Sequence, residues 1–481
     1  MAGDWLSATA FAPALRDALA TADRLLGPAG HGWVVGGTVR DLLLGRPSRD
    51  LDLVVPSGAL DLGRALADRL GWSFFALDER RGVCRAVGEG QVDVADFRAP
   101  TLTADLEARD FSVNALAVSV RALIERGGAT VEDPTGGRAD LAARRVRLCG
   151  PRALAEDPVR VLRAARLAAQ PGWTLDVHVE PAARAVAPSL AGTAAERVRD
   201  ELIGMLEEPD TGRALRLLDR MDVPAVVLPE SAAMRATTQT PPHRFDVWEH
   251  SLRAVEAMDD IASHLDGLEP WGGDLAAHLI EPVGDGLTRG GAMKLAALLH
   301  DVSKPETRAL VDGRTRFIGH DKLGAERARA IGRRLRLSTR ATEIVARLVA
   351  HHLRPMHLAQ AGLITRRARH RFFRDLGDEA RDLVLVTLAD AAAVRGDPPL
   401  AIWAGTAGDV LRLLIQGMNE EERIAAAPPL LTGHDVMGAL GLGPGPEIGR
   451  HLARVRERQA LGLLTTREEA LAYLDRARPI A

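Results

Sequence analysis

Short apolar runs of two different periodicities alternate in the first 150 residues. Continuous apolar runs typical of strands lie at 33–35, 51–55, 91–97 and 113–120. Apolar residues at helical spacing occupy 5–28, 39–44 and 60–70. Because strand-like and helix-like segments are mixed here, the pattern predicts an α/β or α+β head domain over residues 1–150.

From residue 154 onward, the apolar spacing is helical nearly to the C-terminus. Two proline-containing stretches interrupt it, TTQTPPHRF at 237–245 and DPPL at 397–400. A chain of 481 residues is expected to hold about three or four domains. The interruptions therefore predict three helical units after the head: a neck at 151–236, a histidine-rich domain at 237–400 and a tail at 401–481.

The composition restricts the class of protein. Aromatic residues make up only 4% of the chain, so Ala, Leu and Val must build most of the core, which favours helices. A net charge of −3 confines any nucleic-acid site to a local surface. Cys84 and Cys149 lie far apart, which argues against a disulfide framework. No apolar run approaches the ~18 residues that span a bilayer and no signal pattern opens the chain, so a cytoplasmic protein without membrane contact is expected.

The stretch VVGGTVRDLLLGRPSRDLDLVV, residues 34–55, joins a glycine turn to an acidic strand. Gly36 and Gly37 permit a sharp turn and a close approach of the backbone to a ligand. Thr38 is expected to cap the following helix, whose first amides and Arg40 would then face an anion such as a phosphate. The alternative is an ordinary strand–turn–helix with an arginine on its surface.

Two aspartates begin the strand that follows. Strand periodicity places Asp50 and Asp52 on the same face, where two like charges repel unless a cation lies between them. Carboxylate oxygens with open positions suit Mg²⁺, which binds few protein ligands together with substrate phosphates. The pair therefore indicates a magnesium site for phosphate chemistry, with a solvated acidic pair as the alternative.

Two further segments carry groups suited to a nucleotide. EARDFSVNALAV at 107–118 contains an arginine for phosphate and an aspartate for ribose hydroxyls. EDPVRVLRAARLAAQ at 156–170 is predicted as one helix that gathers two acids and two arginines on a third of its circumference, namely Glu156, Asp157, Arg160 and Arg163. Arg166 falls about 180° from Asp157 on such a helix. A salt-bridged helix face is the alternative.

Histidines and aspartates gather in the region 237–400. The candidate ligands are His250, His300, Asp301, His320, His351, His352 and Asp390, of which one of the adjacent His351 and His352 is expected to take part. Imidazole and carboxylate ligands in this number suit two divalent metal ions. The alternative is a domain that still binds metal but has little catalytic turnover and serves to bind RNA.

In combination, the head motifs resemble those of the class II nucleotidyltransferases, the bacterial CCA-adding tRNA nucleotidyltransferases and poly(A) polymerases. The histidine-rich region resembles the HD-domain metal-dependent phosphohydrolases, and Lys304 fits their H-D-x-x-K pattern. The resemblance implies an α+β multidomain protein with a polymerase-β-like head, a mixed sheet with helices, followed by an all-helical neck, HD domain and tRNA-binding tail. One departure is Ala108, which stands where the family usually has an arginine.

The resemblance also implies roles for individual residues. Mg²⁺ would bind Asp50 and Asp52, with Asp93 as a third catalytic acid and Asp96 as its rival. The nucleotide would be bound by Gly36, Gly37, Arg40, Arg109, Asp110, Asn114, Asp157, Arg160, Arg163 and Arg166. Among these, Asp157 and Arg160 would pair with the base of CTP or ATP. The HD site would hold Mg²⁺, Mn²⁺, Ni²⁺ or Fe²⁺.

The function implied is the addition of C and A to tRNA 3′ ends from CTP and ATP, with release of pyrophosphate, beside a metal-dependent hydrolysis of phosphomonoesters or 2′,3′-cyclic phosphates. Addition of A alone, of CC alone or of a poly(A) tail remains open within the family. Two other classes also remain, an HD phosphohydrolase with a nucleotide-sensing head and a non-catalytic RNA-binding protein.

Overall fold

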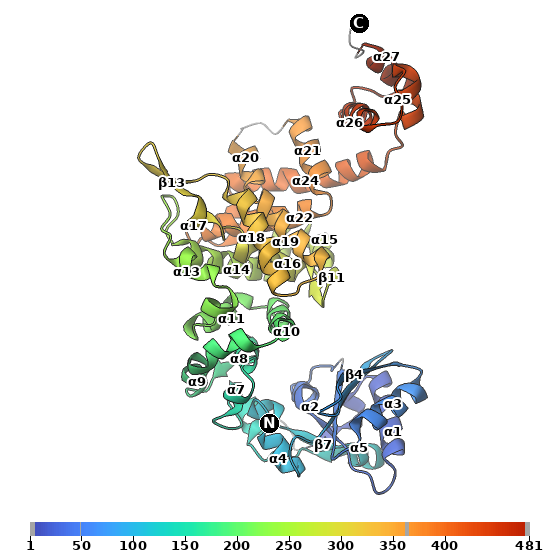
Figure 1. The fold of residues 1–481 in the computed structure, drawn as a ribbon, viewed down its shortest axis with the longest axis vertical. Coiled ribbons are helices and arrows are strands. Elements are labelled where there is room, and N and C mark those ends of the chain that lie inside the picture. The colour runs from blue at the N-terminus through green and yellow to red at the C-terminus, as the bar shows by residue number, and fades with distance from the viewer. Residues whose placement is uncertain (1–4, 49, 361–364, 477–481) are drawn as a thin grey trace. The chain divides into compact units, whose positions relative to one another are not determined.

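The computed structural model describes residues 5–48, 50–360 and 365–476 (Figure 1). The chain divides into two compact units. The first comprises the residues up to Glu201 together with Arg213–Val227, and the second comprises Leu202–Gly212 and the residues from Leu228 onward. The division of the chain into four domains stays a prediction.

A mixed six-stranded sheet forms the centre of the first unit (Figure 1). Its strand order is β4 (Ser73–Asp78), β5 (Val83–Val87), β6 (Gln91–Asp96), β3 (Asp50–Val55), β2 (Trp33–Val35) and β7 (Ala117–Ser119). β3 and β6 run parallel, whereas all other neighbours in this sheet are antiparallel. The predicted mixed sheet of the head is therefore confirmed, and with it the strands at 33–35, 51–55 and 91–97.

Helices cover the apolar side of this sheet. α3 (Ala59–Leu70) packs on β5 and β6, and α1 (Pro13–Leu26) packs on α3. Gly63 of α3 permits this approach, because a Cβ at that position would lie 2.3 Å from Sγ of Cys84. Leu51 is buried on the same strand that carries the two aspartates, so strand alternation leaves the acids on the opposite side.

Two predicted elements at the edges of the head differ from the structure. The helix predicted over 5–28 begins only at Pro13, because Trp5–Ser7 forms β1, which pairs with β8 (Gly128–Thr130). The strand predicted over 113–120 is shorter. Ser112–Asn114 forms a 3₁₀ turn, and the side chain of Ser119 accepts a hydrogen bond from the Ala122 N–H, which ends β7 and starts α5 (Val120–Arg126).

The helix predicted over 156–170 is also interrupted. α7 (Ala153–Glu156) and α8 (Arg160–Ala168) are separate helices, and Asp157 between them is extended. Pro158 explains the interruption, because the residue before a proline is disfavoured in the helical region. The first unit continues through α9 (Val179–Val186) and through α11 (Thr211–Arg220) from Arg213 onward.

The second unit is a helical assembly and fits the predicted all-helical region. It also has two small hairpins, one of β11 (Pro282–Gly284) and β12 (Leu287–Thr288), the other of β13 (Arg308–Val311) and β14 (Arg314–Phe317). Helices that contact one another within it are α14 (Val247–Ser263), α16 (Arg289–Leu299), α18 (His320–Arg334), α19 (Thr339–His351) and α22 (Glu379–Ala393). Its last helices are α25 (Gly433–Leu440), α26 (Pro446–Ala460) and α27 (Arg467–Arg476), which share an apolar cluster of their own around Val436, Val455 and Leu474. Among the described residues, no helix is both long and apolar enough to cross a membrane.

Candidate active site

Three carboxylates lie on one face of the sheet in the first unit. Asp50 and Asp52 alternate with the buried Leu51 on β3, and the parallel register places Asp93 of β6 directly beside Asp52. Burial raises the pKa of Asp52 to about 6, and the charges of Asp93 and Asp50 add to the increase, while Arg109 opposes it. The head therefore concentrates negative charge at one point, which is the environment that a divalent cation neutralises.

Asp93 has a cationic partner of its own. Nε and Nη2 of Arg85 each donate to one of its carboxylate oxygens at 2.8 Å. The rival acid, Asp96, has a different function in the structure, because its Oδ1 accepts from the Ala59 N–H at 2.8 Å at the start of α3. The structure thus brings Asp93 to the acidic pair and uses Asp96 at a helix terminus.

The glycine turn passes close to these acids. α2 (Gly36–Leu43) begins at Gly36, whose φ is +69°, and a Cβ there would lie 3.1 Å from Oδ2 of Asp52. The prediction that Thr38 caps this helix is wrong, because it lies inside α2. Oγ1 of Thr38 instead donates to the Asp50 carbonyl at 3.2 Å and accepts from the Asp52 N–H at 3.0 Å. Thr38 therefore fixes α2 to the acidic strand, a role that spacing alone did not reveal.

Four predicted nucleotide-binding residues form one chain of polar contacts. Nη1 of Arg40 donates to Oδ1 of Asn114 at 2.7 Å, and Nδ2 of Asn114 donates to Oδ1 of Asp110 at 3.2 Å. Nη1 of Arg163 donates to Oδ2 of Asp110 at 2.9 Å. Although burial opposes it, Arg163 lowers the pKa of Asp110 to about 2, so this carboxyl stays ionised as an acceptor. Three separate sequence motifs therefore meet at Asp110.

Arg109 is held by a residue that the sequence patterns did not identify. Asp105 of α4 (Leu102–Glu107) is completely buried, and its Oδ2 accepts from Nη2 of Arg109 at 3.0 Å. A Cβ at Gly36 would lie 3.5 Å from Nη1 of Arg109, so this guanidinium stands beside the glycine turn. A Cβ at Gly37 would likewise lie 3.5 Å from Nη2 of Arg40. The two arginines therefore flank the turn that is proposed to face phosphates.

The residues proposed to read the base lie at the break between α7 and α8. Oδ2 of Asp157 accepts from Nη2 of Arg197 at 2.7 Å and lies 3.8 Å from Nε of Arg160. Oδ1 of Asp157 is buried and has no hydrogen-bond partner among the described residues. Nη1 of Arg160 donates to the Ala153 carbonyl at 2.9 Å. A buried carboxylate oxygen without a partner fits a ligand that donates to it.

Arg166 lies next to Arg163 in the folded chain. Both donate to the buried Glu201 of α10 (Ala195–Leu206), Arg163 at 2.7 Å and Arg166 at 3.0 Å. Arg163 also donates to Asp110, whereas Arg166 forms no hydrogen bond or ion pair with Asp110 among the described residues. Glu201 therefore aligns both arginines, and Arg163 is the one that connects to the nucleotide-binding chain.

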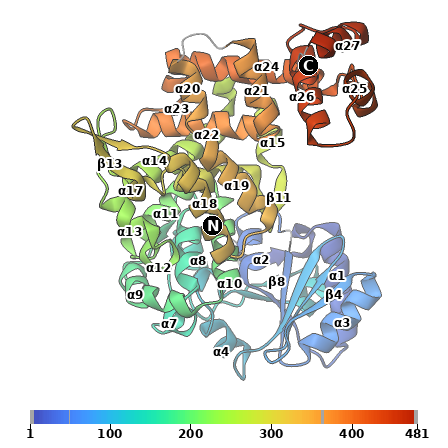
Figure 2. The ribbon, with the colours of Figure 1, turned by 45° about the horizontal axis from the view of Figure 1, so that its top comes forward.

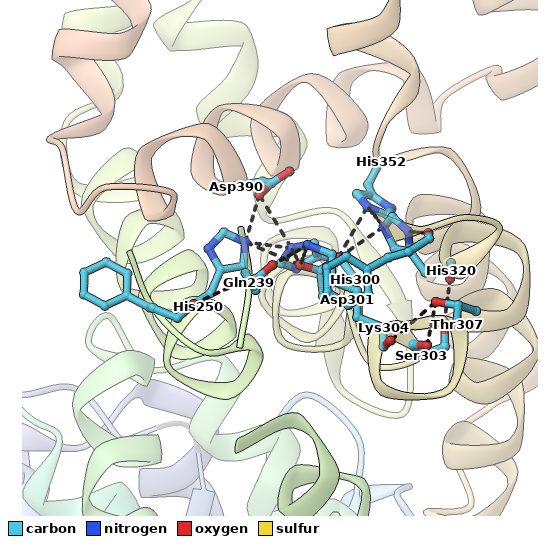
Figure 3. A network of polar contacts seen from close by, with 12 residues as sticks. Gln239, His250, His300, Asp301, Ser303, Lys304, Thr307, His320, His352 and Asp390 are labelled. Atoms are coloured by element: carbon cyan, nitrogen blue, oxygen red, sulfur yellow. Dashed lines mark hydrogen bonds and ion pairs between the residues drawn. The ribbon is translucent and has the colours of Figure 1, made fainter. Parts of the chain in front are cut away.

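In the second unit, six of the predicted ligands converge (Figure 3). Their ligand atoms form two groups within 4.8 Å, one of His250, His300 and Asp390, and the other of Asp301, His320 and His352. Asp301 lies between the groups, with Oδ2 3.1 Å from Nε2 of His300 and Oδ1 3.3 Å from Nε2 of His320. We refer to these six residues as the HD cluster.

Backbone carbonyls orient the imidazoles of the HD cluster. Nδ1 of His300, His320 and His352 lies 2.8, 2.6 and 2.7 Å from the carbonyl oxygens of residues 297, 317 and 349. Since a carbonyl only accepts, each Nδ1 carries a proton, which leaves Nε2 as the ring atom that can bind a metal ion in the cluster. This is the second-sphere arrangement of metal-ligating histidines.

The electrostatics of the HD cluster fit cations. Nε2 atoms of His320 and His352 are only 3.2 Å apart, a separation that two lone pairs tolerate when a cation binds both. Although burial opposes it, the carboxylates of Asp301 and Asp390 raise the pKa of His300 to about 10. These two carboxylates, of which Asp301 is buried and Asp390 partly buried, require compensating positive charge, which divalent metal ions would supply.

His351 does not belong to either group of ligand atoms. Its side chain is only half-buried and lies near Arg354 and Arg347, and burial lowers its pKa. The adjacent His352 is 1% exposed and faces the cluster. Neighbouring helical positions point about 100° apart, so only one of the two can face a given site.

Two residues of the stretch at 237–245 also lie against the HD cluster. Oε1 of Gln239 accepts from Nζ of Lys304 at 2.7 Å, and the same Nζ lies 2.6 Å from Oδ2 of Asp301 (Figure 3). The ring of His243 lies 5.3 Å from that of His250, edge to face, and burial together with Lys304 lowers the pKa of His243 to about 4. A single Gln and His in a proline-rich stretch carry no periodic signal, so sequence patterns indicated only a joint here.

Comparison with known proteins identifies the domains that contain the two candidate sites. A family model described as the Poly A polymerase head domain matches residues 32–147, and one described as the HD domain matches residues 247–394. A third, described as a probable RNA and SrmB-binding site of polymerase A, matches residues 172–234.

Relatives match along most of the chain. It is 37% identical to an A-adding tRNA nucleotidyltransferase of Deinococcus radiodurans, over 92% of this chain and 94% of that protein. It is 38% identical to a CC-adding tRNA nucleotidyltransferase of Thermus thermophilus, over 92% of each. The solved structure of the Thermotoga maritima CCA-adding enzyme complexed with tRNA has the same fold, with a TM-score of 0.60 at 19% identity over 98% of this chain and 99% of that one. The chain belongs to the family of tRNA nucleotidyltransferases, and it carries an HD domain.

Proposed function

We propose that this chain adds C and A nucleotides from CTP and ATP to the 3′ end of tRNA and releases pyrophosphate. The observation that carries the proposal is the position of Asp50, Asp52 and Asp93 on one face of β3 and β6. When bound there, Mg²⁺ would activate the attacking hydroxyl and neutralise charge on the transferring phosphate. Asp50 and Asp52 are the proposed ligands, and Asp93, aligned by Arg85, is the third acid.

The remaining groups of the head bind and orient the nucleotide in this proposal. The glycine turn of Gly36 and Gly37 and the guanidinium groups of Arg40 and Arg109 receive the triphosphate. Asp110, ionised and held by Arg163, accepts from the ribose hydroxyls. These contacts fix the α-phosphate in front of the tRNA 3′-hydroxyl, which is how positioning lowers the barrier of phosphoryl transfer.

Base selection is proposed for Asp157 and Arg160. The buried Oδ1 of Asp157 without a partner is suited to accept from the exocyclic amine that C and A share, and Arg160 is suited to donate to ring acceptors. G and U lack an amine at the corresponding edge position, so they leave the carboxylate unpaired.

A second candidate is the addition of A alone or of CC alone. Two relatives that match over 92% of this chain are named A-adding and CC-adding. A protein of Halorhodospira halophila named a multifunctional CCA protein matches over 66%. The test is incubation with labelled CTP, ATP or both, on tRNAs that end at the discriminator base, at C or at CC. Extension of all three tRNAs to CCA supports the proposal. Extension only of the tRNA that ends in CC would indicate addition of A alone, and extension that stops at CC would indicate addition of CC alone.

We also propose that the HD cluster hydrolyses phosphate esters at RNA ends, with phosphomonoesters or 2′,3′-cyclic phosphates as substrates. Divalent ions would be bound by the six cluster residues and would supply Lewis acidity for attack by water. Asp50→Ala is expected to abolish transfer to tRNA and to spare the phosphatase activity. His300→Ala combined with Asp301→Ala is expected to do the reverse. Transfer that survives Asp50→Ala would refute the assignment of the head.

A further inference from the structure

A β-hairpin of the second unit is inserted between two parts of the HD cluster. β13 (Arg308–Val311) follows α17 (Lys304–Thr307), and β14 (Arg314–Phe317) ends shortly before the ligand His320. Asp312 and Gly313 form the turn with φ values of +52° and +71°, a conformation favoured in two-residue hairpin loops. Figures 1 and 2 both show the hairpin, labelled β13, extending away from the helices of its unit.

The base of this hairpin is fastened to the HD cluster. Nδ1 of His320 lies 2.6 Å from the carbonyl oxygen of Phe317, the last residue of β14. Nζ of Lys304 lies 5.5 Å from the centre of the Phe317 ring and 2.6 Å from Oδ2 of Asp301. A substrate chain that leaves the cluster on this side therefore meets the hairpin first.

The hairpin is basic on both faces. The register pairs Ala309 with Arg316 and Val311 with Arg314, so the two arginines share one face, while Arg308 and Phe317 share the other. All three arginines are exposed, and none forms an ion pair with the residues that the structure describes. On the neighbouring helix α18, three arginines at 327, 329 and 334 are paired with Glu306, Glu343 and Glu230, whereas Arg333 forms no ion pair with the described residues.

We propose that this hairpin binds the phosphates of an RNA strand whose 3′ end lies at the HD cluster. The inference rests on the proposed hydrolytic function of that cluster. Exposed guanidinium groups without carboxylate partners are suited to phosphates, and Leu310, 77% exposed, offers apolar contact to a base. Arg314 lies about 10 Å along the strand from Phe317, so the single phosphate of a mononucleotide held at the cluster does not reach it. The hairpin therefore selects polymeric over monomeric substrates.

The test compares two double variants that remove the same charge. Arg314→Ala/Arg316→Ala alters the hairpin, and Arg333→Ala/Arg340→Ala alters two exposed arginines at the far ends of α18 and α19. These control positions lie about 20 and 18 Å along their helices from the ligands His320 and His352. Hydrolysis is measured with the full chain on an oligoribonucleotide ending in a 2′,3′-cyclic phosphate and on 2′,3′-cyclic AMP.

The hairpin variant is expected to raise KM for the oligoribonucleotide about tenfold, with kcat unchanged and with normal kinetics on the mononucleotide. The slope of log kcat/KM against log salt should become shallower by about 0.7 for each lost phosphate contact. The control variant should match the wild type on both substrates.

Three results would overturn the proposal. If the hairpin and control variants had equal KM values for the oligoribonucleotide, the hairpin would have no role in RNA binding, and the proposed hydrolytic function would be unaffected. A wild type that hydrolyses neither substrate would refute the hydrolytic function, and the role of the hairpin would fall with it. If Leu310→Ser changed the oligomeric state in light scattering while the arginine variants behaved as the control, the hairpin would be a protein contact instead.

Discussion

Asp52 is a proposed metal ligand, and its ionisation in the folded protein should lower the free energy of unfolding by a measurable amount. Its folded pKa of about 6 lies above the ordinary 3.8, so protonation favours the folded state. This contribution is complete below about pH 4 and is lost as pH rises through about 6. We predict that the metal-free first unit loses about 1–3 kcal/mol across this range and that Asp52→Asn abolishes the loss. Thermal unfolding in a chelator between about pH 4 and 8 measures both.

The matched control for this measurement is Asp17→Asn, which removes the same charge from an exposed position on α1. It should keep the pH dependence of the wild type. The prediction would be contradicted if the free energies of unfolding of the wild type and Asp52→Asn differed by the same amount at about pH 4 and at about pH 8. Asp52→Asn is also expected to abolish transfer to tRNA, because an amide is a poor ligand for Mg²⁺ in this site.

Thr38 offers a second prediction at this scale. Thr38→Val keeps the volume but leaves the Asp52 N–H and the Asp50 carbonyl without the Oγ1 partner. The expected loss is about 1–3 kcal/mol of stability, together with about 10- to 100-fold weaker apparent Mg²⁺ affinity in the transfer assay. Urea denaturation and Mg²⁺ titration measure the two effects. Thr38→Ser restores the hydroxyl and should restore both, and a Thr38→Val protein with normal Mg²⁺ dependence would count against the role.

Individual residues show which parts of the sites could be predicted from sequence. Strand alternation correctly placed Asp50 and Asp52 together, because it depends only on local geometry. It could not separate Asp93 from Asp96, since the answer depends on the register of β6 against β3. Glu201 stayed undetected for the same reason, because only the fold brings it to Arg163. Asp105 stands four residues before Arg109, a local spacing that the sequence analysis did not use.

At the scale of elements, the interruption between α7 and α8 matters for base selection. Pro158→Ala removes the restriction that keeps Asp157 extended, so the two helices can join. We expect Asp157 to turn with the new helix and to lose its position beside Arg160 and Arg197. The prediction is a fall in the ratio of kcat/KM for CTP over UTP and for ATP over GTP, with a stability change of about 1 kcal/mol or less.

Pro151→Ala is the control for this change, because it removes an exposed proline just before α7 and leaves the Asp157–Pro158 bond intact. Its discrimination between nucleotides should equal that of the wild type. If Pro158→Ala also kept full discrimination, the extended conformation of Asp157 would be irrelevant to base selection.

β4, a strand of the central sheet that sequence patterns did not identify, has a physical explanation. β4 lies at the edge of the sheet and is exposed at most of its positions, so it lacks the alternation of a half-buried strand. Phe75 and Leu77 of β4 are about half exposed in spite of their apolar side chains. The helical character of the chain after residue 154 was easier to predict, because the periodicity of long helices such as α14 and α19 repeats over several turns.

At the scale of the whole molecule, a near-neutral net charge is compatible with the proposed RNA substrate, because many surface arginines are paired with carboxylates and others are not. Many surface arginines are neutralised by carboxylates, as Arg327 is by Glu306, and contribute little to a long-range field. The arginines of the β13–β14 hairpin form no ion pair with the described residues, so their charge stays available to a phosphate. Net charge alone therefore could not predict where RNA binds, because the distribution of ion pairs is a property of the fold.

The two compact units lead to a final prediction about metal removal. Units with separate cores are expected to unfold in separate transitions. Metal is first removed with a chelator, and the chelator is then removed. Free Mn²⁺ at about 100 times its Kd for the HD cluster should stabilise the second unit by about 2.7 kcal/mol, because Mn²⁺ binds only the folded cluster. Calorimetry should show this shift in the wild type and in Asp52→Asn. His320→Ala, which removes one ligand of the HD cluster, should abolish it, and an equal shift in His320→Ala would place the bound metal elsewhere.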